Sequence, residues 1–501
     1  MTPWGAVYVL VVLVLALPGL HRVLLIARAV RPRPVRPVPE GLPDERPWVT
    51  VQLPVYNERE VVADLVDAVS ALRWPAQRLE LQLLDDSDDD TFGAATPALD
   101  RARARGIAVR VLRRAERTGF KAGALAAGVA AARGELFAIF DADFRPAPDF
   151  LERLVPEFAD PTVAMVQARW GHANADHNAL TAAQAAMLDA HFSVEHHARF
   201  RSGLWIHFNG TAGVWRRAAI EAAGGWEGDT LTEDLDLSYR AQLAGWRLVY
   251  RDDVVVPAEL PPTMPALLAQ QRRWAKGSIE TLRKLGGRIV RADVSAGVKL
   301  EALQHLTANL AWPLSVVLAV LLPVVVVRGG LGAADVLLGL PLLLVATGSH
   351  AAYFFLPGRA RIGAVARALV LGPGLGVSQG RAVLEALAGR RSPFVRTPKG
   401  AAAATAAGAG WALGELALAA WLVGGLGAAV HSGQWEAALF LALFAGGYGW
   451  VGVAASRGRR PNGSATHNAP DGAKASAGSA CASMPQAASA SGARQPVTTS
   501  R

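Results

Sequence analysis

Five long apolar segments constrain the fold of this chain more than any other feature of its sequence. A membrane-spanning helix needs about 20 consecutive, mostly apolar residues, and such runs lie at the amino end and throughout the second half of the chain. They occupy residues 1–26, 307–327, 336–356, 407–430 and 435–455. We therefore expect a multi-pass membrane protein with about five spans, whose soluble part lies between the first and second.

Two apolar stretches allow a second interpretation. Residues 1–26 could be a cleaved signal peptide, but the run begins without a basic region and no small-residue cleavage site follows it. Residues 362–388 are interrupted by Arg367 and by the sequence Gly372-Pro373-Gly374. We expect an interfacial or re-entrant segment there rather than a complete span.

Basic residues gather beside the apolar segments and indicate how the spans are oriented. The chain carries 51 lysines and arginines against 42 acidic residues, a formal net charge of +9. Arginines are concentrated in residues 27–46, a linker after the first span, and at Arg457, Arg459 and Arg460 after the last. By the positive-inside rule these flanks and the soluble part are cytoplasmic. The same distribution argues against a basic nucleic-acid-binding surface.

Residues 457–501 are rich in alanine, serine and glycine and have almost no large apolar side chains. A segment of this composition cannot bury enough apolar surface to fold, so we expect it to be disordered. It contains the single cysteine, Cys481. A disulfide within one chain is therefore excluded, as is a cysteine-based zinc site.

Residues 47–285, the soluble part, alternate between short apolar runs and amphipathic stretches. This alternation is typical of an α/β domain with a mostly parallel sheet. The expected strands are residues 48–53, 79–84, 107–112, 136–140 and 163–166, and the expected helices are 61–72, 121–132, 180–200, 216–223, a helix from 232, and 264–285. Because such sheets bind ligands at the carboxyl ends of their strands, polar residues directly after strands are the candidate site.

Two aspartates follow the apolar strand at residues 136–140. Asp141 and Asp143 are separated by one residue, so their side chains reach one ion only if the chain turns there, and we expect Pro146 and Pro148 to supply that turn. Paired carboxylates with open positions suit Mg²⁺ or Mn²⁺ that also holds phosphate oxygens. On its own, however, this tripeptide also fits a solvated turn.

Further polar groups stand at other predicted element ends. Thr232 is expected to cap a helix whose first turn carries acids, where the helix dipole favours negative charge. The basic amphipathic stretch 264–285 would by composition alone lie at a membrane interface. The histidines at 172, 191, 196 and 197 lack a third ligand at suitable spacing, so we expect packed or solvated side chains rather than a metal site.

Six short motifs follow one another in the soluble part. They are Pro54-Val55-Tyr56-Asn57-Glu58, Asp85-Asp86-Ser87, Lys121-Ala122-Gly123, Asp141-Ala142-Asp143, Thr232-Glu233-Asp234 and Gln270-x-x-Arg273-Trp274. In this order they resemble the processive glycosyltransferases of family 2, the cellulose-synthase-like group, over roughly residues 47–285. The segments RWGHAN and FNGTAGVWRR are most similar to the mannan- and glucan-synthase-like branch. The resemblance implies a GT-A-like nucleotide-sugar-binding domain inserted between membrane spans.

The resemblance also implies a role for each matching residue. It implies donor binding by Tyr56, Glu58, Asp85, Asp86, Lys121, Gln270 and Arg273; acceptor binding by Asn209, Gly210, Thr211 and Trp274; metal binding by Asp141 and Asp143; and general base catalysis by Asp234, with Glu233 as the alternative. Inversion at an anomeric carbon requires such a carboxylate, because the attacking hydroxyl must lose its proton. Taken singly, each residue also fits a structural role such as a turn acid, a surface lysine or a helix start.

The sequence thus predicts an inverting glycosyltransferase of a bacterial-type inner membrane, dependent on Mg²⁺ or Mn²⁺. It would transfer a hexose from UDP-glucose or GDP-mannose to a growing β-linked polysaccharide and pass the polymer through its own spans. The same site could instead glycosylate a lipid acceptor once. A membrane transporter without catalysis is the alternative of another class, although the acidic motifs all lie in the soluble part.

Overall fold

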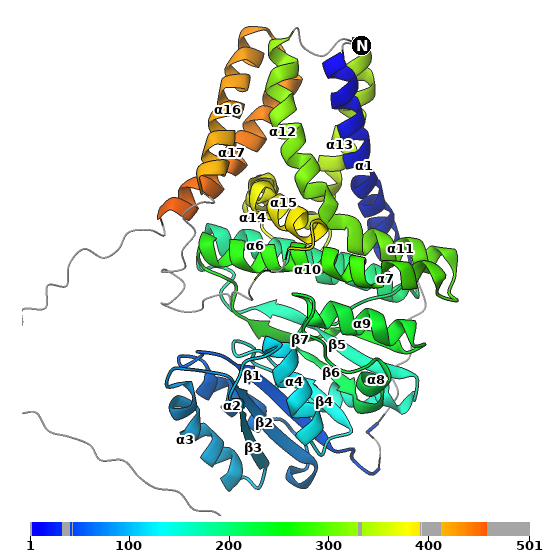
Figure 1. The fold of residues 1–501 in the computed structure, drawn as a ribbon, viewed down its shortest axis with the longest axis vertical. Coiled ribbons are helices and arrows are strands. Elements are labelled where there is room, and N and C mark those ends of the chain that lie inside the picture. The colour runs from blue at the N-terminus through cyan, green and yellow to red at the C-terminus, as the bar shows by residue number, and fades with distance from the viewer. Residues whose placement is uncertain are drawn as a thin grey trace, which may run out of the picture. The chain divides into compact units, whose positions relative to one another are not determined.

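The computed structural model describes residues 3–32, 41–42, 44–328, 333–390, 392 and 412–457. Helix α1 (Pro3–Val30) precedes the α/β domain, and the other apolar helices follow it along the chain (Figure 1). Part of the expected basic linker, the start of the expected span at 407–430 and the expected disordered tail after residue 457 lie outside the described residues.

Within the described residues, the α/β domain is built on one seven-stranded sheet in the order β3-β2-β1-β4-β6-β5-β7. Its strands are β1 (Val49–Val55), β2 (Leu79–Asp85), β3 (Ala108–Arg113), β4 (Leu136–Ile139), β5 (Val163–His172), β6 (Gly213–Arg216) and β7 (Arg247–Ala258). Neighbouring strands are parallel except in the two pairs that contain β6. The prediction of an α/β domain with a mostly parallel sheet is therefore confirmed.

The sequence analysis missed strands β6 and β7. The direction of β6 places the residues before it at the carboxyl edge of the sheet. This strand runs antiparallel to both β4 and β5. Its first residues therefore lie at the edge where β4 and β5 end. This brings Asn209 and Gly210, shortly before β6, to the carboxyl ends of the parallel strands.

Strand β1 continues through Pro54, where we expected it to stop. The carbonyl of Gln52 accepts from Phe140 on the β4 side, and that of Val55 accepts from Asp86 on the β2 side. The nitrogen of Pro54 consequently faces the β4 side, where β4 has already ended at Ile139. The ladder between β1 and β4 ends at this point, so proline, which has no N–H, is tolerated there.

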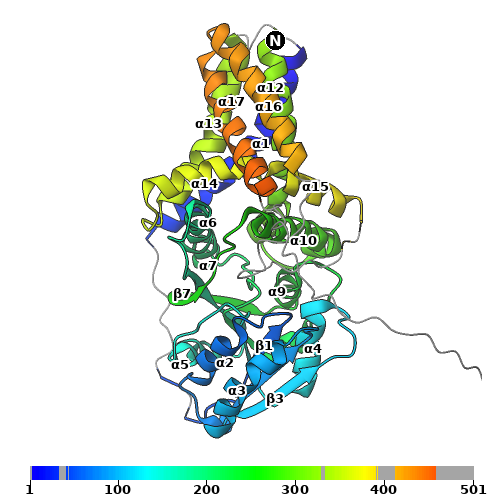
Figure 2. The same cartoon turned by 90° about the vertical axis from the view of Figure 1, so that its left-hand side faces the viewer.

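Helices cover both faces of the sheet (Figure 2). One face packs against α2 (Val62–Ser70), α3 (Thr91–Ala104) and α5 (Phe150–Leu154), and the other against α4 (Phe120–Ala131), α8 (Arg217–Ala222) and α9 (Glu233–Leu243). The α4 face of β1 and β2 is polar: Gln52 donates to Gln82 at 3.1 Å. Helix α4 approaches this pair closely because Gly128 has no side chain; a Cβ there would lie 2.3 Å from Gln52 Nε2.

The long helix expected at residues 180–200 is interrupted. It consists of α6 (Ala179–Ala190), a π-helical segment (His191–His196) and α7 (His197–Arg201). Helix α10 (Met264–Arg291) extends past the domain end that we expected at residue 285 and leads to α11 (Ala296–Thr307). Short 3-10 turns complete the chain path at Ala76–Arg78, Val155–Ala159 and Ala308–Leu310.

The apolar helices agree with about five spans. Among the described residues, four stretches are long and apolar enough to cross a membrane: Pro3–Val30, Ala296–Val327 (α11 with α12, Ala311–Val327), Ala412–His431 (α16) and Trp435–Arg457 (α17). Helix α13 (Ala333–Phe355) packs along α1. Some of its side chains are not among those that the structure describes. The ambiguous segment forms α14 (Ile362–Gly374) and α15 (Gly376–Leu387), bent by 47° at the predicted glycine-proline break.

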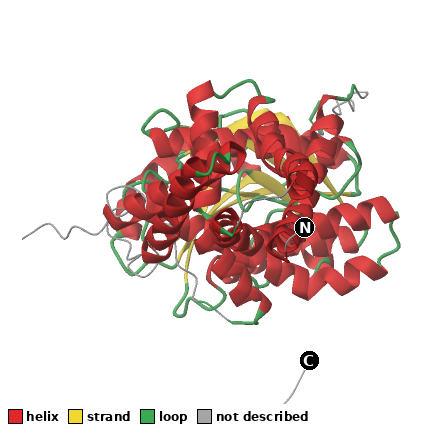
Figure 3. Cartoon of the chain, turned by 90° about the horizontal axis from the view of Figure 1, so that it is seen from above, coloured by secondary structure: helices red, strands yellow, loops and turns green. Residues whose placement is uncertain are grey.

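The α/β domain contacts the apolar helices through α6 and α10, which pack against α14 and α15 respectively. Seen from above, helices lie over the strands of the sheet (Figure 3). The carboxyl edge of the sheet therefore lies close to α10, the helix that carries the last of the sequence motifs.

Candidate functional site

A cleft opens at the carboxyl edge of the sheet, between the strand ends and α10. Its empty volume is about 1510 Å³ with the open mouth included. It gathers nearly all the residues that the sequence motifs singled out: Tyr56, Glu58, Asp86, Lys121, Asp141, Asp143, Asn209, Gly210, Glu233, Asp234, Gln270, Arg273 and Trp274.

Asp141 and Asp143 reach the same cleft because the chain turns at the aspartates themselves. The amide of Phe144 donates to the carbonyl of Asp141 at 3.0 Å and closes a turn directly after β4. We had expected Pro146 and Pro148 to make this turn, but it is complete before either of them. The amide of Asp141 donates to the Thr211 hydroxyl at 2.9 Å, which fixes the first residue of the turn.

Lys121 is the cation at the centre of the acidic residues. It lies in the first turn of α4, and its Nζ is 2.5 Å from Asp141 Oδ1 and 2.8 Å from the carbonyl of Gly210. Burial lowers the pKa of Lys121, but the carboxylates of Asp141, Glu233 and Asp234 outweigh burial and raise it overall. The lysine therefore stays charged and joins the end of β4 to the segment before β6.

Glu233 and Asp234 stand at the first turn of α9 and face the cleft. Burial and the neighbouring carboxylate of Glu233 raise the pKa of Asp234 to about 7, against the opposing effect of Lys121. Burial also raises the pKa of Glu233. A carboxyl group with a pKa near neutrality can both take up and release a proton at physiological pH.

Thr232 occupies the capping position of α9, but its side chain makes no capping hydrogen bond. It packs against α10 instead: a Cβ placed on Gly277 would lie 2.5 Å from the Thr232 hydroxyl oxygen. The predicted cap is thus wrong, because contact with α10 has turned the side chain away from the helix end.

The segment before β6 brings its backbone against Asp234, the expected general base. Gly210 has a φ of +81°, and a Cβ there would lie 2.9 Å from Asp234 Oδ2 and 3.6 Å from Lys121 Nζ. Both the left-handed backbone and the close approach favour glycine. The buried side chain of Gln167 holds this segment by accepting from the amide of Asn209 at 2.9 Å and donating to the carbonyl of Thr211 at 3.1 Å.

Two residues that we expected in the site do not line the cleft. The carboxylate of Asp85 is buried, accepts from the amide of Ser87 at 3.0 Å and pairs with Arg113 at 3.0 Å. Successive residues of a strand point to opposite faces, so Asp85 and Asp86 cannot both face the cleft. Thr211 is fully buried and binds the Asp141 amide. Asp85 and Thr211 therefore support the site without facing it.

The outer end of the cleft holds Tyr56, Glu58 and Asp86 together with Arg117, which the sequence analysis missed. The guanidinium carbon of Arg117 lies 3.4 Å from the centre of the Tyr56 ring. Both carboxylate oxygens of Asp86 accept from Arg114, which limits what else Asp86 can bind. Arg117 does not follow a predicted strand and belongs to none of the sequence motifs, so only its contact with Tyr56 shows that it is part of the site.

Helix α10 forms the opposite wall with Gln270, Arg273 and Trp274. Burial lowers the pKa of Arg273, while Glu233, Asp141 and Asp234 act to raise it. Trp274 lies 6.5 Å from Trp170, ring centre to ring centre. Trp170, at the end of β5, and the loop at residues 258–262 also line the cleft. The expected strand was too short to include Trp170, which is why the sequence analysis missed it.

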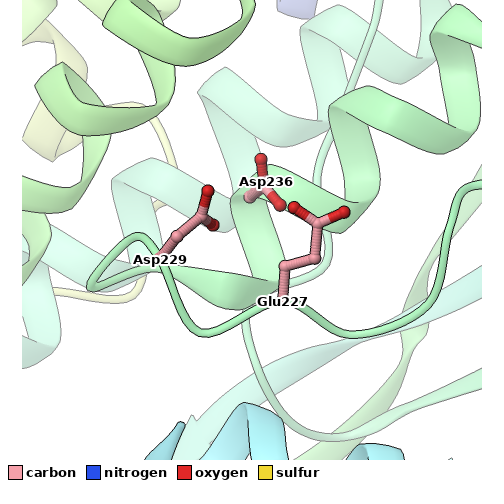
Figure 4. A group of neighbouring side chains, drawn as sticks. All are labelled: Glu227, Asp229 and Asp236. Atoms are coloured by element: carbon pink, nitrogen blue, oxygen red, sulfur yellow. The ribbon is translucent and has the colours of Figure 1, made fainter.

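A second acidic group lies apart from these residues. Among the described residues, Glu227, Asp229 and Asp236 are the only such group with carboxylate oxygens within 4.8 Å of one another (Figure 4). Lys284 already fills it, with its Nζ 2.6, 2.7 and 3.1 Å from these three carboxylates. The arrangement is an ion-pair cluster between α9 and α10, and we do not assign a metal to it.

Comparison with known proteins agrees with the fold and the motifs. Residues 136–357 match the model of "Glycosyl transferase family group 2". The chain is 44% identical over 250 residues to glucomannan 4-beta-mannosyltransferase 2 of Arabidopsis thaliana, covering 49% of this chain and 47% of that protein. It is 42% identical over 278 residues to glucomannan 4-beta-mannosyltransferase 1 of Oryza sativa subsp. japonica, covering 53% of each. The chain thus spans about half the length of the curated relatives it matches.

A solved structure has the same fold. It is a mannosyltransferase from Pyrobaculum calidifontis in complex with GDP-Man and Mn²⁺, with a TM-score of 0.57, 23% identity, and coverage of 77% of this chain and 100% of that one. At this identity the similarity establishes the GT-A-like fold alone. The family match and the plant relatives, each over about half of the chain, make this chain similar to the family 2 glycosyltransferases.

Proposed function

We propose that this protein is an inverting, metal-dependent mannosyltransferase that transfers mannose from GDP-mannose to the end of a β-linked polysaccharide at a membrane. The observation that carries the proposal is the convergence of Lys121, Asp141 and Asp234 on one cleft, with Lys121 within 2.5 Å of Asp141. The choice of mannose is supported by the relatives, which are named as glucomannan mannosyltransferases.

A divalent metal fits the donor set of the cleft. Asp141 and Asp143 offer carboxylate oxygens, the ligands that Mg²⁺ and Mn²⁺ prefer, and both line the cleft. The Pyrobaculum structure, in complex with GDP-Man and Mn²⁺, supports a metal in this fold. The bound ion would offset the negative charge that builds on the departing diphosphate. Asp141 would exchange part of its contact with Lys121 for the ion.

The other cleft residues would bind the donor and accept the proton of the acceptor hydroxyl. Lys121 and Arg273 are cations that would bind phosphate oxygens of the donor. Tyr56, with Glu58 and Asp86, stands at the outer end, where the base of the nucleotide would lie. Asp234, whose pKa is raised to about 7, would accept the proton of the acceptor hydroxyl as it attacks the anomeric carbon opposite the leaving diphosphate. Glu233 is the alternative base.

The acceptor would enter from the side of Asn209, Gly210 and Trp274. The indole of Trp274 offers a flat apolar face of the kind that packs against a sugar ring. Helix α10 lines the cleft and packs against α15, so the acceptor side of the cleft lies near the apolar helices, and a growing chain would leave the site towards the spans. The arginines beside the spans support a cytoplasmic position for the α/β domain.

Membranes that contain the protein test this proposal when they are incubated separately with labelled GDP-mannose and UDP-glucose. We expect a β-linked mannan only from GDP-mannose, only with Mn²⁺ or Mg²⁺, and not after treatment with EDTA. A polymer formed from UDP-glucose would refute the donor assignment. A single labelled sugar on a lipid would refute polymer synthesis and indicate a glycolipid synthase instead.

A further inference from the structure

A chain of polar contacts leads from α1 to the cleft. It consists of His21 and Arg28 on α1, Glu301 on α11, Arg199 on α7, Glu195 and His191 on the π-helical segment, and Asn209; we call it the α1–Asn209 network. None of these residues except Asn209 belongs to the motifs of the sequence. In Figure 1, α7 and α11 lie beside the lower end of α1.

Glu301 is the junction at the membrane end of the network. His21 Nε2 lies 2.8 Å from one of its carboxylate oxygens, and Arg28 donates to the other at 3.0 Å. Arg199 donates through Nε to the first oxygen at 3.0 Å. Glu301 is 5% exposed and Arg199 is 1% exposed. Buried charges of this kind persist only where they are paired, so α1, α7 and α11 are held in one arrangement.

Glu195 continues the network towards the cleft. Its carboxylate is 2.6 Å from Arg199 Nη1 and 3.3 Å from His191 Nδ1, and it accepts from the Tyr353 hydroxyl at 3.0 Å. Burial would raise the pKa of Glu195, but Arg199 and His191 outweigh it and hold the pKa well below its usual range. Glu195 therefore stays ionised and fixes His191.

His191 makes the last link. Its Nε2 lies 3.2 Å from Asn209 Oδ1. The backbone of Asn209 is fixed separately by Gln167, so the contact with His191 sets how the amide of Asn209 is turned. His191 and Glu195 both lie on the π-helical segment, a local geometry that is frequent at functional sites.

We propose that His191, Glu195 and Arg199 are positioning residues that orient the Asn209 amide at the acceptor end of the cleft, and that α1 completes this arrangement through Glu301. The inference rests on the proposed function, since it assigns Asn209 to the acceptor. It gives α1 a second role besides membrane anchoring: through Glu301, α1 helps to orient the residues that align the acceptor.

The test uses the full-length protein in nanodiscs and three variants. His191→Leu removes the last link but leaves the Arg199–Glu301 pair intact, and Arg199→Met removes the centre of the network. Arg251→Met is the matched control, since Arg251, on β7, is also held by carboxylates, those of Asp253 and Glu157. The measurements are the Kd for GDP with Mn²⁺ and kcat/KM for transfer of mannose to an added mannooligosaccharide.

We expect His191→Leu and Arg199→Met to lower kcat/KM for the acceptor by about 100-fold, the loss typical of a misplaced reacting group, with the Kd for GDP unchanged. Arg251→Met should match the wild type in both. Normal acceptor kcat/KM in His191→Leu would overturn the inference, as would a GDP affinity that falls in step with transfer. Arg199→Met tests the link to α1, and His191→Leu by itself decides whether the contact with Asn209 matters for transfer. If the wild type itself transfers no mannose, the proposed function fails first.

Discussion

Replacing Asp234 by asparagine should remove the expected base and at the same time stabilise the protein at high pH. The pKa of Asp234 is raised from 3.8 to about 7. A raised pKa means that folding favours the protonated form, so ionisation costs stability as the pH rises from 3.8 to 7. At about 1.4 kcal/mol per unit of pKa, the cost at pH 8 is at most about 4 kcal/mol. The destabilisation is smaller than this upper limit, because Asp234 is only partly buried.

The assay is thermal unfolding of the detergent-solubilised protein between pH 4 and pH 8. A change of about 1 kcal/mol in unfolding free energy shifts the melting temperature by roughly 2–4 °C for a domain of this size. Asp234→Asn should therefore melt several degrees above the wild type at pH 8 and at the same temperature as the wild type at pH 4. Asp100→Asn, which changes an exposed carboxylate, is the control and should follow the wild type throughout. A difference in melting temperature between Asp234→Asn and the wild type that stays the same at every pH would refute the assignment of a raised pKa to Asp234.

Three further predictions concern the cleft and the residues that support it. Gly210→Ala should lower transfer about 100-fold, because its Cβ would press on the Asp234 carboxylate, whereas Gly203→Ala, at a similar φ but with open space around it, should leave kcat unchanged; equal rates would contradict the close approach. Gln167→Met should lower the unfolding free energy by about 1–3 kcal/mol in urea titrations, because buried backbone groups lose their partner; an unchanged midpoint would contradict this. Arg117→Met should weaken GDP binding in calorimetry by about 1–2 kcal/mol, and an unchanged Kd would exclude Arg117 from the nucleotide site.

Much of the cleft could be predicted because most of its residues follow strands or open helices. Asp141, Asp86 and Lys121 stand at element ends that apolar periodicity marks in the sequence. The choice between Asp85 and Asp86 could not be made in this way. It depends on which face of β2 each residue occupies, and the apolar run gives no sign of that because β2 is buried on both faces.

The rest of the site depends on contacts between distant parts of the chain. Strand β6 has four residues, too few to display a period, yet its antiparallel direction brings Gly210 to Asp234. Arg117 is recognised only by its contact with Tyr56. The side chain of Thr232 turns to α10 because Gly277 leaves room there, and no rule of helix capping takes account of a neighbouring helix.

The central claim is that one cleft binds the donor through Asp143 and its metal and activates the acceptor through Asp234. It is tested most directly by measuring GDP-mannose affinity with Mn²⁺ and the rate of mannosyl transfer on the same two variants, Asp143→Asn and Asp234→Asn. The account predicts that Asp143→Asn loses metal-dependent donor binding, whereas Asp234→Asn binds the donor normally and loses transfer by about 100-fold or more. Normal transfer in Asp234→Asn, or metal-dependent donor binding of wild-type strength in Asp143→Asn, would contradict it.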